Sequence, residues 1–490
     1  MIVAESETIL PKVTATKIFD DAETDEGAFS YKVLNGSAVA VTAYNQDAKV
    51  VVIPSKIAGY TVQEISSDAF KGKVVQRLVL PRELSAIESN AFINCKQLTT
   101  VRFAGSVRSI GSYAFEGCTA LSDLVMPEGL RTIGYRAFDG CSGLVTVNLP
   151  DSVTNIQGNA FRNCINLEII NYPMSLAECG SGTFKGDAKL TGITVPEGVT
   201  DLAESAFASN DSLTRITLPS TLKTIGSSAF ADCTGLTEID LPGGLKNIGS
   251  YAFEGCTGIT AIAVPDGVES YGYRAFHGCT GLAQINYPAS LKASSTQVYS
   301  GCSKLKKIAV PEGVERLPEN AFAGAGNLTS VMLPATLTGI GASAFQGTGV
   351  KSVEIPEGVT VLPSYAFSGC TGLTNIKLPD GLKSIDSYAF EGCTGMTALA
   401  IPDGVESYGY RAFYGCTGLT QINYPASLKT SSTQVYGGCS SLRNIEVPEG
   451  VTALPANAFS GAGYFRTITL PSTLGSIGES AFDGCSSLTK

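Results

Sequence analysis

Residues 213–233 read LTRITLPSTLKTIGSSAFADC, and this order of apolar, proline, glycine, aromatic and cysteine positions returns along most of the chain. Nineteen aromatic positions, from Phe70 to Phe482, are separated by sixteen intervals of 23 residues and two of 22. Seventeen are Phe, and Tyr299 and Tyr436 occupy the other two. A fixed period of this length is typical of stacked units, so the sequence predicts a solenoid. We call each unit a rung and name it by its aromatic residue.

Each rung is expected to hold one short strand followed by a turn. Ile216 and Leu218 alternate with the polar Thr217, which is the period of a strand with one buried face. Pro219 ends the strand because proline has no N–H group for the ladder. Residues 228–230 are expected to open a short helical turn. The predicted fold class is α/β, with about nineteen rungs, one parallel sheet on the concave face on the order of 90 Å long, and short helices and turns on the convex face.

Three segments are expected along the chain. Residues 1–25 are acidic and polar, which favours a flexible segment. In residues 26–65, two alternating runs flank Asn35–Gly36, a strong hairpin turn, so we predict a β-hairpin that caps the first rung. Residues 66–490 form the solenoid. Because the last residues resemble the start of another strand, a truncated C-terminus is expected, with further rungs or an anchor beyond it.

The composition excludes several classes of function. The net charge is −10 and the pI is about 4.9, which disfavours a basic face for nucleic acid. No run of 18 apolar residues is present, so no membrane insertion is expected. The first residues lack a basic stretch followed by an apolar run. The protein is therefore cytoplasmic, or a secretion signal is absent from this sequence.

Thirteen of the fourteen cysteines lie three residues after the aromatic position of a rung, and only Cys179 does not. Neighbouring rungs would bring these cysteines within disulfide reach. A small apolar residue repeated in every rung nevertheless favours a ladder of buried thiols. No CxxC pair is present, so no metal site is predicted.

The pattern L-x-x-I-x-L-P-x-x-L-x-x-I-G-x-x-A-F-x-x-C resembles the BspA-like leucine-rich repeats of bacterial surface proteins, over about residues 50–490. The resemblance implies a leucine-rich-repeat solenoid, a place outside the cell or on the surface of a bacterium, and binding to host matrix proteins or other cells. The alternative is an architectural spacer of a larger surface protein. The outward residues that would form a long binding face include Arg102, Asp123, Asn148, Thr217, Glu238, Lys307, Glu354 and Lys377.

A second, longer period lies above the first. Residues 251–302 and 388–439 are 137 apart and identical at 45 of 52 positions. In both copies a tyrosine, Tyr287 or Tyr424, replaces the last inward leucine of the strand, and a buried tyrosine hydroxyl needs a partner. A weaker copy holds Ile170-Asn-Tyr-Pro. These rungs are either locally bent rungs copied by duplication or a recurring ledge on the surface.

The ledge hypothesis supplies the candidate binding residues. Gln284 and Asn286 are expected to lie beside Ala261 and Ala263, where amides next to a flat floor could hold a sugar or a peptide backbone. Exposed tyrosines beside Arg274 and its later equivalent are a second candidate contact, although single exposed aromatic residues are common. The predicted ligand-binding residues are Gln284, Asn286, Gln421, Asn423, Tyr273 and Tyr410. The expected partner is a host extracellular protein or glycan, or another cell surface.

No catalytic residue or cofactor is predicted. His277 is the only histidine, and Tyr414 takes its place in the later copy, so a nucleophile would have no base. Cys179 is a candidate reactive thiol, but a bystander is the simpler interpretation. Glu238 and Asp240 share one strand face, which favours a solvated acidic spot over the paired carboxylates of a glycosidase. The chain is therefore predicted to be no enzyme.

Overall fold

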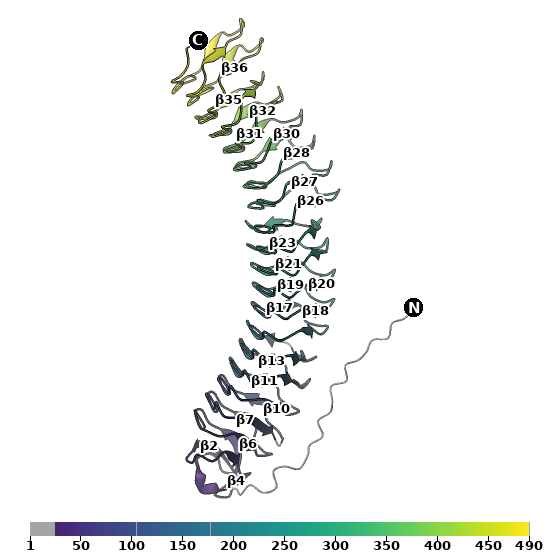
Figure 1. Cartoon of the computed structure of the whole chain (residues 1–490), viewed down its shortest axis with the longest axis vertical. Coiled ribbons are helices and arrows are strands. Elements are labelled where there is room, and N and C mark those ends of the chain that lie inside the picture. Colours follow the sequence, from purple (N-terminus) through teal and green to yellow (C-terminus); the bar gives the residue numbers. More distant parts are fainter. Residues whose placement is uncertain (1–24, 104, 177, 490) are drawn as a thin grey trace, which may run out of the picture.

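The computed structural model describes residues 25–103, 105–176 and 178–489, which form a long curved rod of stacked rungs (Figure 1). The predicted flexible segment lies outside the described residues, apart from Asp25. Each rung is one turn of the chain around the axis of the rod, and the next rung begins beside the place where the previous one began (Figure 1). The chain is therefore a β-solenoid, as the 23-residue period predicts.

The strands lie in two columns instead of the one sheet that the sequence predicted. The first column holds the strands with the Ile-x-Leu pattern: β3 (Val50–Val52), β6 (Arg77–Leu80), β8 (Thr100–Phe103), β10 (Asp123–Val125), β12 (Thr146–Val147), β14 (Ile169–Ile170), β16 (Gly192–Thr194), β18 (Arg215–Thr217), β20 (Glu238–Ile239), β22 (Ala261–Ile262), β24 (Gln284–Ile285), β26 (Lys307–Ala309), β27 (Ser330–Met332), β28 (Ser352–Glu354), β30 (Asn375–Lys377), β32 (Ala398–Leu399), β34 (Gln421–Ile422), β36 (Asn444–Glu446) and β38 (Thr467–Thr469).

The second column holds the strands that precede the bend before each aromatic residue. These are β5 (Tyr60–Ile65), β7 (Ala86–Ile87), β9 (Ser109–Ile110), β11 (Thr132–Ile133), β13 (Asn155–Ile156), β15 (Glu178–Cys179), β17 (Asp201–Leu202), β19 (Thr224–Ile225), β21 (Asn247–Ile248), β23 (Ser270–Tyr271), β25 (Ala293–Ser294), β29 (Val361–Leu362), β31 (Ser384–Ile385), β33 (Ser407–Tyr408), β35 (Thr430–Ser431), β37 (Ala453–Leu454) and β39 (Ser476–Ile477). Neighbours in both columns pair in parallel, and each column is divided into several shorter sheets.

The aromatic residues form a stack between the two columns. Phe115 and Phe138, for example, have ring centroids 5.2 Å apart and planes 3° apart. These rings are buried except for the half-buried Phe482, and the cysteine of the same rung is buried beside most of them. Each rung thus covers the ring of its neighbour, which explains why one rung cannot form a core by itself.

The predicted helices are replaced by hydrogen-bonded turns. Among the described residues the helical element is a 3-10 turn, η1 (Glu26–Ala28). Around Phe230, the residues Ser228 and Asp232 have positive φ angles of 54° and 59°, which a right-handed helix excludes. Alternate N–H groups donate to the next rung, as Phe230 does to Ala252 O at 2.8 Å, and Ala229 donates three residues back. The α/β class is therefore not what the structure shows.

The absence of helices on the described turns also changes the curvature. In Figure 1 the strands of the first column, for example β18, β20 and β26, lie on the outer, convex side of the curved rod. The predicted placement of this sheet on the concave face is therefore wrong. A helix is about 10 Å wide, whereas strands are about 4.8 Å apart, so helices would spread the turn side. Here the turns are stacked as closely as the strands and cannot force the strands onto the inner side.

An antiparallel hairpin precedes the first full rung. Strand β1 (Phe29–Asn35) pairs with β2 (Ala38–Tyr44), and β2 pairs in parallel with β5. A short strand, β4 (Lys56–Ile57), pairs with the beginning of β5 through a tight antiparallel turn. The hairpin lies where Asn35–Gly36 predicted one.

The second column is interrupted at the three rungs that contain the Asn-Tyr-Pro sequence. Its sheets end at β15, β25 and β35, and each of these strands belongs to such a rung. The first column is divided more often, at places that include the junction of β24 with β26, so only the second column marks these three rungs. These rungs are therefore places where the regular stacking of strands stops.

An asparagine side chain explains the interruption. In a regular rung the N–H of Val310 donates to the backbone oxygen of Met332, 22 residues later, at 2.9 Å. At the same offset, the N–H of Val264 donates instead to Oδ1 of Asn286, and Nδ2 of Asn286 donates to the Val264 oxygen, both at 2.6 Å. Because the side chain replaces the peptide group, the backbone after it is free to leave the ladder. The equivalent pairs are Leu149 with Asn171 and Ile401 with Asn423.

The core is repacked beside each asparagine. Tyr287 is 2% exposed, and the neighbouring isoleucine position is reduced to Ser294, as it is to Cys179 in the first of the three rungs. The expectation that each buried tyrosine hydroxyl finds a partner is wrong here. The buried hydroxyls of Tyr287 and Tyr424 make no hydrogen bond.

We expect the variant Asn286→Ala to lower the free energy of unfolding by about 1–3 kcal/mol, because the Val264 N–H loses its acceptor. Urea unfolding followed by circular dichroism measures the change. The exposed Gln284 in the same rung supplies the control, because Gln284→Ala removes no internal hydrogen bond and should change stability by less than about 0.5 kcal/mol. Equal effects of the two substitutions would contradict the role assigned to Asn286.

The cysteines give a second prediction. All fourteen are free thiols and twelve are buried, with Sγ donating to a carbonyl in the preceding rung, as Cys233 does to Phe207 at 3.0 Å. Burial raises the pKa of Cys233 to about 12, so little thiolate forms at about pH 8. We expect the half-buried Cys179 and Cys485 to be alkylated first in the folded protein. Unfolding without reductant should release all fourteen thiols, and a clear deficit would show disulfides.

Candidate functional site

The predicted ledge lies on the first column, where the strand ladder opens. Strand pairing places Gln284 opposite Ala261, and the two strands border a depression of about 750 Å³. Its other wall comes from β26 and the residues that precede it. The lining residues are Ala261, Ile262, Ala263, Ala283, Gln284, Ile285, Asn286, Lys304, Lys306, Lys307 and Ala309.

The two predicted amides of this ledge are not equivalent. Gln284 is exposed and its side chain makes no internal hydrogen bond, so both its donor and its acceptor can meet a ligand. Asn286 uses its amide on Val264. The later copy repeats this division, with Gln421 exposed and Asn423 bonded to Ile401. The binding role of these four residues stays a prediction, and the asparagines have a structural role beside it.

Three lysines in the same depression were not identified as a site from the sequence. Lys304, Lys306 and Lys307 are exposed and line the wall that faces Gln284. The signal was present, because three lysines within four residues are unusual in a chain with a net charge of −10. The ledge is therefore bordered by positive charge on one side.

The second predicted contact, at Tyr273, is a packed polar cluster on the turn side. The Tyr273 hydroxyl and Nε of Arg274 donate to Oε1 of Gln297, at 3.2 and 2.7 Å. The Arg274 guanidinium lies 5.2 Å from the centre of the Tyr273 ring, whose other neighbour is Tyr251 in an edge-on contact. These contacts hold both side chains in place and leave Tyr273 half-buried.

The later copy of this cluster is larger. Tyr410 and Arg411 bond Gln434 in the same way, at 3.3 and 2.6 Å. Arg411 also lies 4.3 Å from the ring centre of Tyr414, which stands where the earlier copy has His277. The structure does not bring Tyr273 or Tyr410 into the depression lined by Gln284, so the predicted site residues form separate groups.

His277 and Cys179 show no arrangement for catalysis. Burial, with the charge of Arg274, lowers the pKa of His277 against the opposing effect of Glu254, and its Nδ1 makes no hydrogen bond. Burial raises the pKa of the Cys179 thiol, which lies 3.5 Å from the Thr183 hydroxyl, so thiolate is disfavoured. Within residues 25–103, 105–176 and 178–489, no three metal-binding side chains come together.

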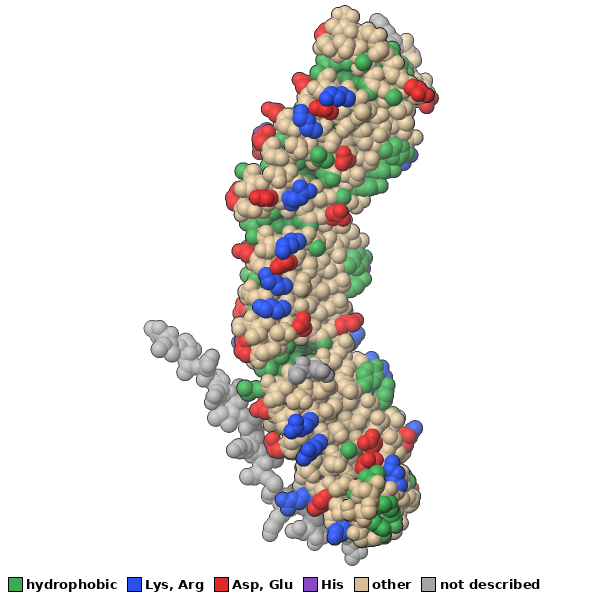
Figure 2. Space-filling view, turned by 180° about the vertical axis from the view of Figure 1, so that it is seen from behind, with side chains coloured by type: hydrophobic (Ala, Val, Ile, Leu, Met, Phe, Trp, Pro, Cys, Tyr) green, Lys and Arg blue, Asp and Glu red, His purple; other side chains and the backbone are tan. Residues whose placement is uncertain are grey.

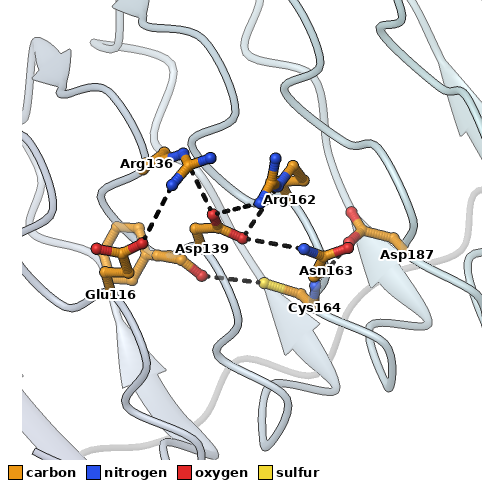
Figure 3. A network of polar contacts seen from close by, with 8 residues as sticks. Glu116, Arg136, Asp139, Arg162, Asn163, Cys164 and Asp187 are labelled. Carbon is orange, nitrogen blue, oxygen red and sulfur yellow. Dashed lines mark hydrogen bonds and ion pairs between the residues drawn. The ribbon is translucent and has the colours of Figure 1, made fainter. Parts of the chain in front are cut away.

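Figure 3 shows a polar network that crosses several rungs on the turn side. Asp139 is 5% exposed. Its Oδ2 forms ion pairs with the guanidinium nitrogens of Arg136 and Arg162, at 3.5 and 3.3 Å. Beyond it lies Asp187, which occupies the cysteine position of its rung and is 0% exposed. Its Oδ1 accepts the N–H of Cys164 at 2.9 Å, while Oδ2 makes no hydrogen bond.

Asn210 occupies the cysteine position of the next rung. Its Nδ2 donates to the Phe184 oxygen at 2.9 Å, as the thiols do elsewhere, and its Oδ1 makes no hydrogen bond. Burial, and to a smaller degree the charge of Asp139, raises the pKa of Asp187 well above its usual range. An aspartate in this environment favours the neutral form, in which its hydroxyl can act as a donor.

This environment predicts a pH-dependent stability. The pKa of Asp187 is higher in the folded than in the unfolded protein. Its contribution to the free energy of unfolding is therefore most favourable below the pKa of the unfolded protein, and it is lost as the pH rises toward the pKa of the folded protein. Asp187→Asn should therefore stabilise the protein, by about 1.4 kcal/mol more for each pH unit above about 4 until the folded pKa is reached. Unfolding midpoints across this range test it. The exposed Asp266, changed to Asn, should show no such trend, and a flat difference for Asp187→Asn would contradict the prediction.

No helix in the described part of the chain is both long and apolar enough to cross a bilayer. A search of curated proteins found no match. Among solved structures, a leucine-rich repeat protein from Bacteroides ovatus ATCC 8483 is similar, with 27% identity and a TM-score of 0.50 over 87% of this chain and 94% of the other. A T. pallidum leucine-rich repeat protein shares 30% identity over 44% of this chain and 92% of its own, with a TM-score of 0.36.

The family described as BspA type leucine rich repeat region (6 copies) matches residues 44–168, 141–260, 246–374 and 361–489. These segments together cover nearly the whole solenoid, and the aromatic, proline and cysteine positions recur within each of them. The resemblance drawn from the repeat pattern is therefore confirmed. The chain belongs to the BspA-type leucine-rich-repeat family, in which it is a β-solenoid of about nineteen turns with parallel strands.

Proposed function

We propose that the chain is a non-enzymatic binding protein of a bacterial surface, or a secreted one, which engages a host extracellular protein or glycan or another cell through the surface of its solenoid. Membership of the BspA-type family supports the bacterial surface setting. The contrast between the two faces of the first column supports the binding role, because only the buried face is uniform.

The inward positions of this column repeat, whereas the outward ones do not. From β18 to β26 each strand buries an isoleucine, such as Ile216. The outward residues at one register of the same strands are exposed and differ in charge and size: Arg215, Glu238, Ala261, Gln284 and Lys307. A core that fixes the backbone and leaves the outer face free suits a large partner, bound by many weak contacts over a long surface.

We also propose that the N-terminal hairpin caps the solenoid. Tyr44 continues the aromatic stack beyond Phe70, with centroids 5.2 Å apart, and Phe29 packs on Tyr44 at 5.4 Å. The hairpin thereby covers the ring that the first rung would otherwise leave open, and β2 covers the edge of β5. Solenoids need such terminal covers for solubility.

A binding screen tests the proposed function. The purified chain is passed over immobilised matrix proteins, mucin and a glycan array, after circular dichroism has shown it to be folded. Saturable binding to one class is the expected result. Failure of the folded protein to bind in any of these classes would overturn the proposal and favour an architectural spacer.

A further inference from the structure

We propose that the depression between β24 and β26 binds an acidic polysaccharide, held by the charges of Lys304, Lys306 and Lys307 and by the Gln284 amide. This inference rests on the proposed binding function and names a ligand class for one place on the surface. It is carried by a depression lined with small residues, by three cations whose side chains are unpaired, and by a related place in the later copy at which none of the three lysines recurs and one is replaced by arginine.

The depression lies where two of the short sheets of the first column meet. Strand β24 pairs with β22, and β26 pairs with β27, but β24 and β26 are not joined in one sheet. On the β22 side, the Asn286 side chain bonds the backbone of Val264 in the preceding rung. The space of about 750 Å³ therefore lies over the junction of two rungs, open to solvent and bordered by strands on both sides.

The positive charge on its wall is not neutralised by the protein. The side chains of Lys304, Lys306 and Lys307 are exposed and make no ion pair or hydrogen bond, whereas Lys292 pairs with Glu269 at 2.8 Å on the same molecule. Figure 2 shows Lys and Arg side chains along one strip of the rod, several of them beside Asp or Glu. A cluster without such neighbours attracts anions, even on a protein whose net charge is −10.

The chemistry of the floor favours a sugar polymer over an acidic peptide. Ala261, Ala263, Ala283 and Ala309 give the depression a flat lining without a deep apolar pocket, so a peptide would find no place for a large anchoring side chain. The free Gln284 amide can donate to and accept from hydroxyl groups. Lysine acts as a point charge and needs no planar partner, so it suits carboxylate or sulfate groups spaced along a flexible chain.

The later copy of the rungs provides a comparison within the same chain. Its floor repeats Ala398, Ala400 and Gln421 at a distance of 137 residues, while Thr420 and Glu446 stand where the first place has Ala283 and Ala309. At the positions of Lys304, Lys306 and Lys307 it has Ser441, Arg443 and Asn444. The side chain of Arg443 is directed to Tyr464, whose ring centre is 5.7 Å away. The two places thus share a backbone and differ in free charge, so only the first should bind the acidic polymer.

The test exchanges these residues in the full chain. The double variant Lys304→Ser/Lys307→Asn takes both new residues from the later copy, where the fold accepts them. We expect its affinity for immobilised heparin or polygalacturonate to fall by at least about tenfold, and the binding that remains to be less sensitive to salt. The reverse variant, Ser441→Lys/Asn444→Lys/Glu446→Ala, which also restores the alanine of the first place, should gain a second binding site. Unchanged urea midpoints exclude a folding defect as the cause.

The probes separate the alternatives. Dextran, a neutral polysaccharide, should not bind, and poly-L-glutamate should bind more weakly than the acidic polysaccharides. Equal or tighter binding of poly-L-glutamate would overturn the ligand class in favour of an acidic peptide. Unchanged heparin binding by Lys304→Ser/Lys307→Asn would overturn the site but leave the proposed function standing. Binding of the folded chain to none of the matrix proteins, mucins or glycans would overturn both.

Discussion

The structure depends on the contact between the aromatic ring of one rung and the ring of the next. This contact runs from Phe70 to Tyr299 and again from Phe322 to Phe482, with Tyr287 packed on Phe322 where the two stacks meet. The stacked rings and the N–H groups around them both find their partners one rung away, as Phe230 does with Phe253 and with the Ala252 oxygen. A rung in isolation would leave both unsatisfied. This reciprocal dependence makes the period strict, because an inserted residue would displace a ring and a hydrogen-bonding group together.

The same dependence explains how the chain can interrupt its own ladder. Asn286 supplies one carbonyl and one amide from its side chain, so the preceding rung keeps its hydrogen bonds while the backbone of the next residues departs. Tyr287 is larger than the leucine of a regular rung and Ser294 is smaller than the isoleucine, so the tyrosine ring fills core space that the serine leaves free. The exchange leaves tyrosine hydroxyls without partners in both copies, which is an energetic cost that a regular rung does not have.

The 23-residue period was predictable from the sequence because large apolar residues recur at it. The conformation of the turns was not predictable, because it depends on the backbone angles of small polar residues. Ser228 gives no sign that it adopts a positive φ, so a short helix was the reasonable expectation around Phe230. That one difference removes the helices and with them the expected curvature. At the ledge, Gln284 and Ala261 were placed together by the register alone. The side-chain hydrogen bonds of Asn286 could be seen only in the structure, since nothing in its spacing distinguishes a free amide from a bonded one.

Function in such a chain is carried by the positions at which the copies differ. The core residues of the two duplicated segments specify the same backbone, so they cannot distinguish one ledge from the other. Lys304 and Lys307 can, because their counterparts Ser441 and Asn444 carry no charge on an equivalent frame. A solenoid thereby separates stability from recognition. The repeat fixes where a side chain points, and each outward position can then change its charge at little energetic cost, since it contributes almost nothing to the core.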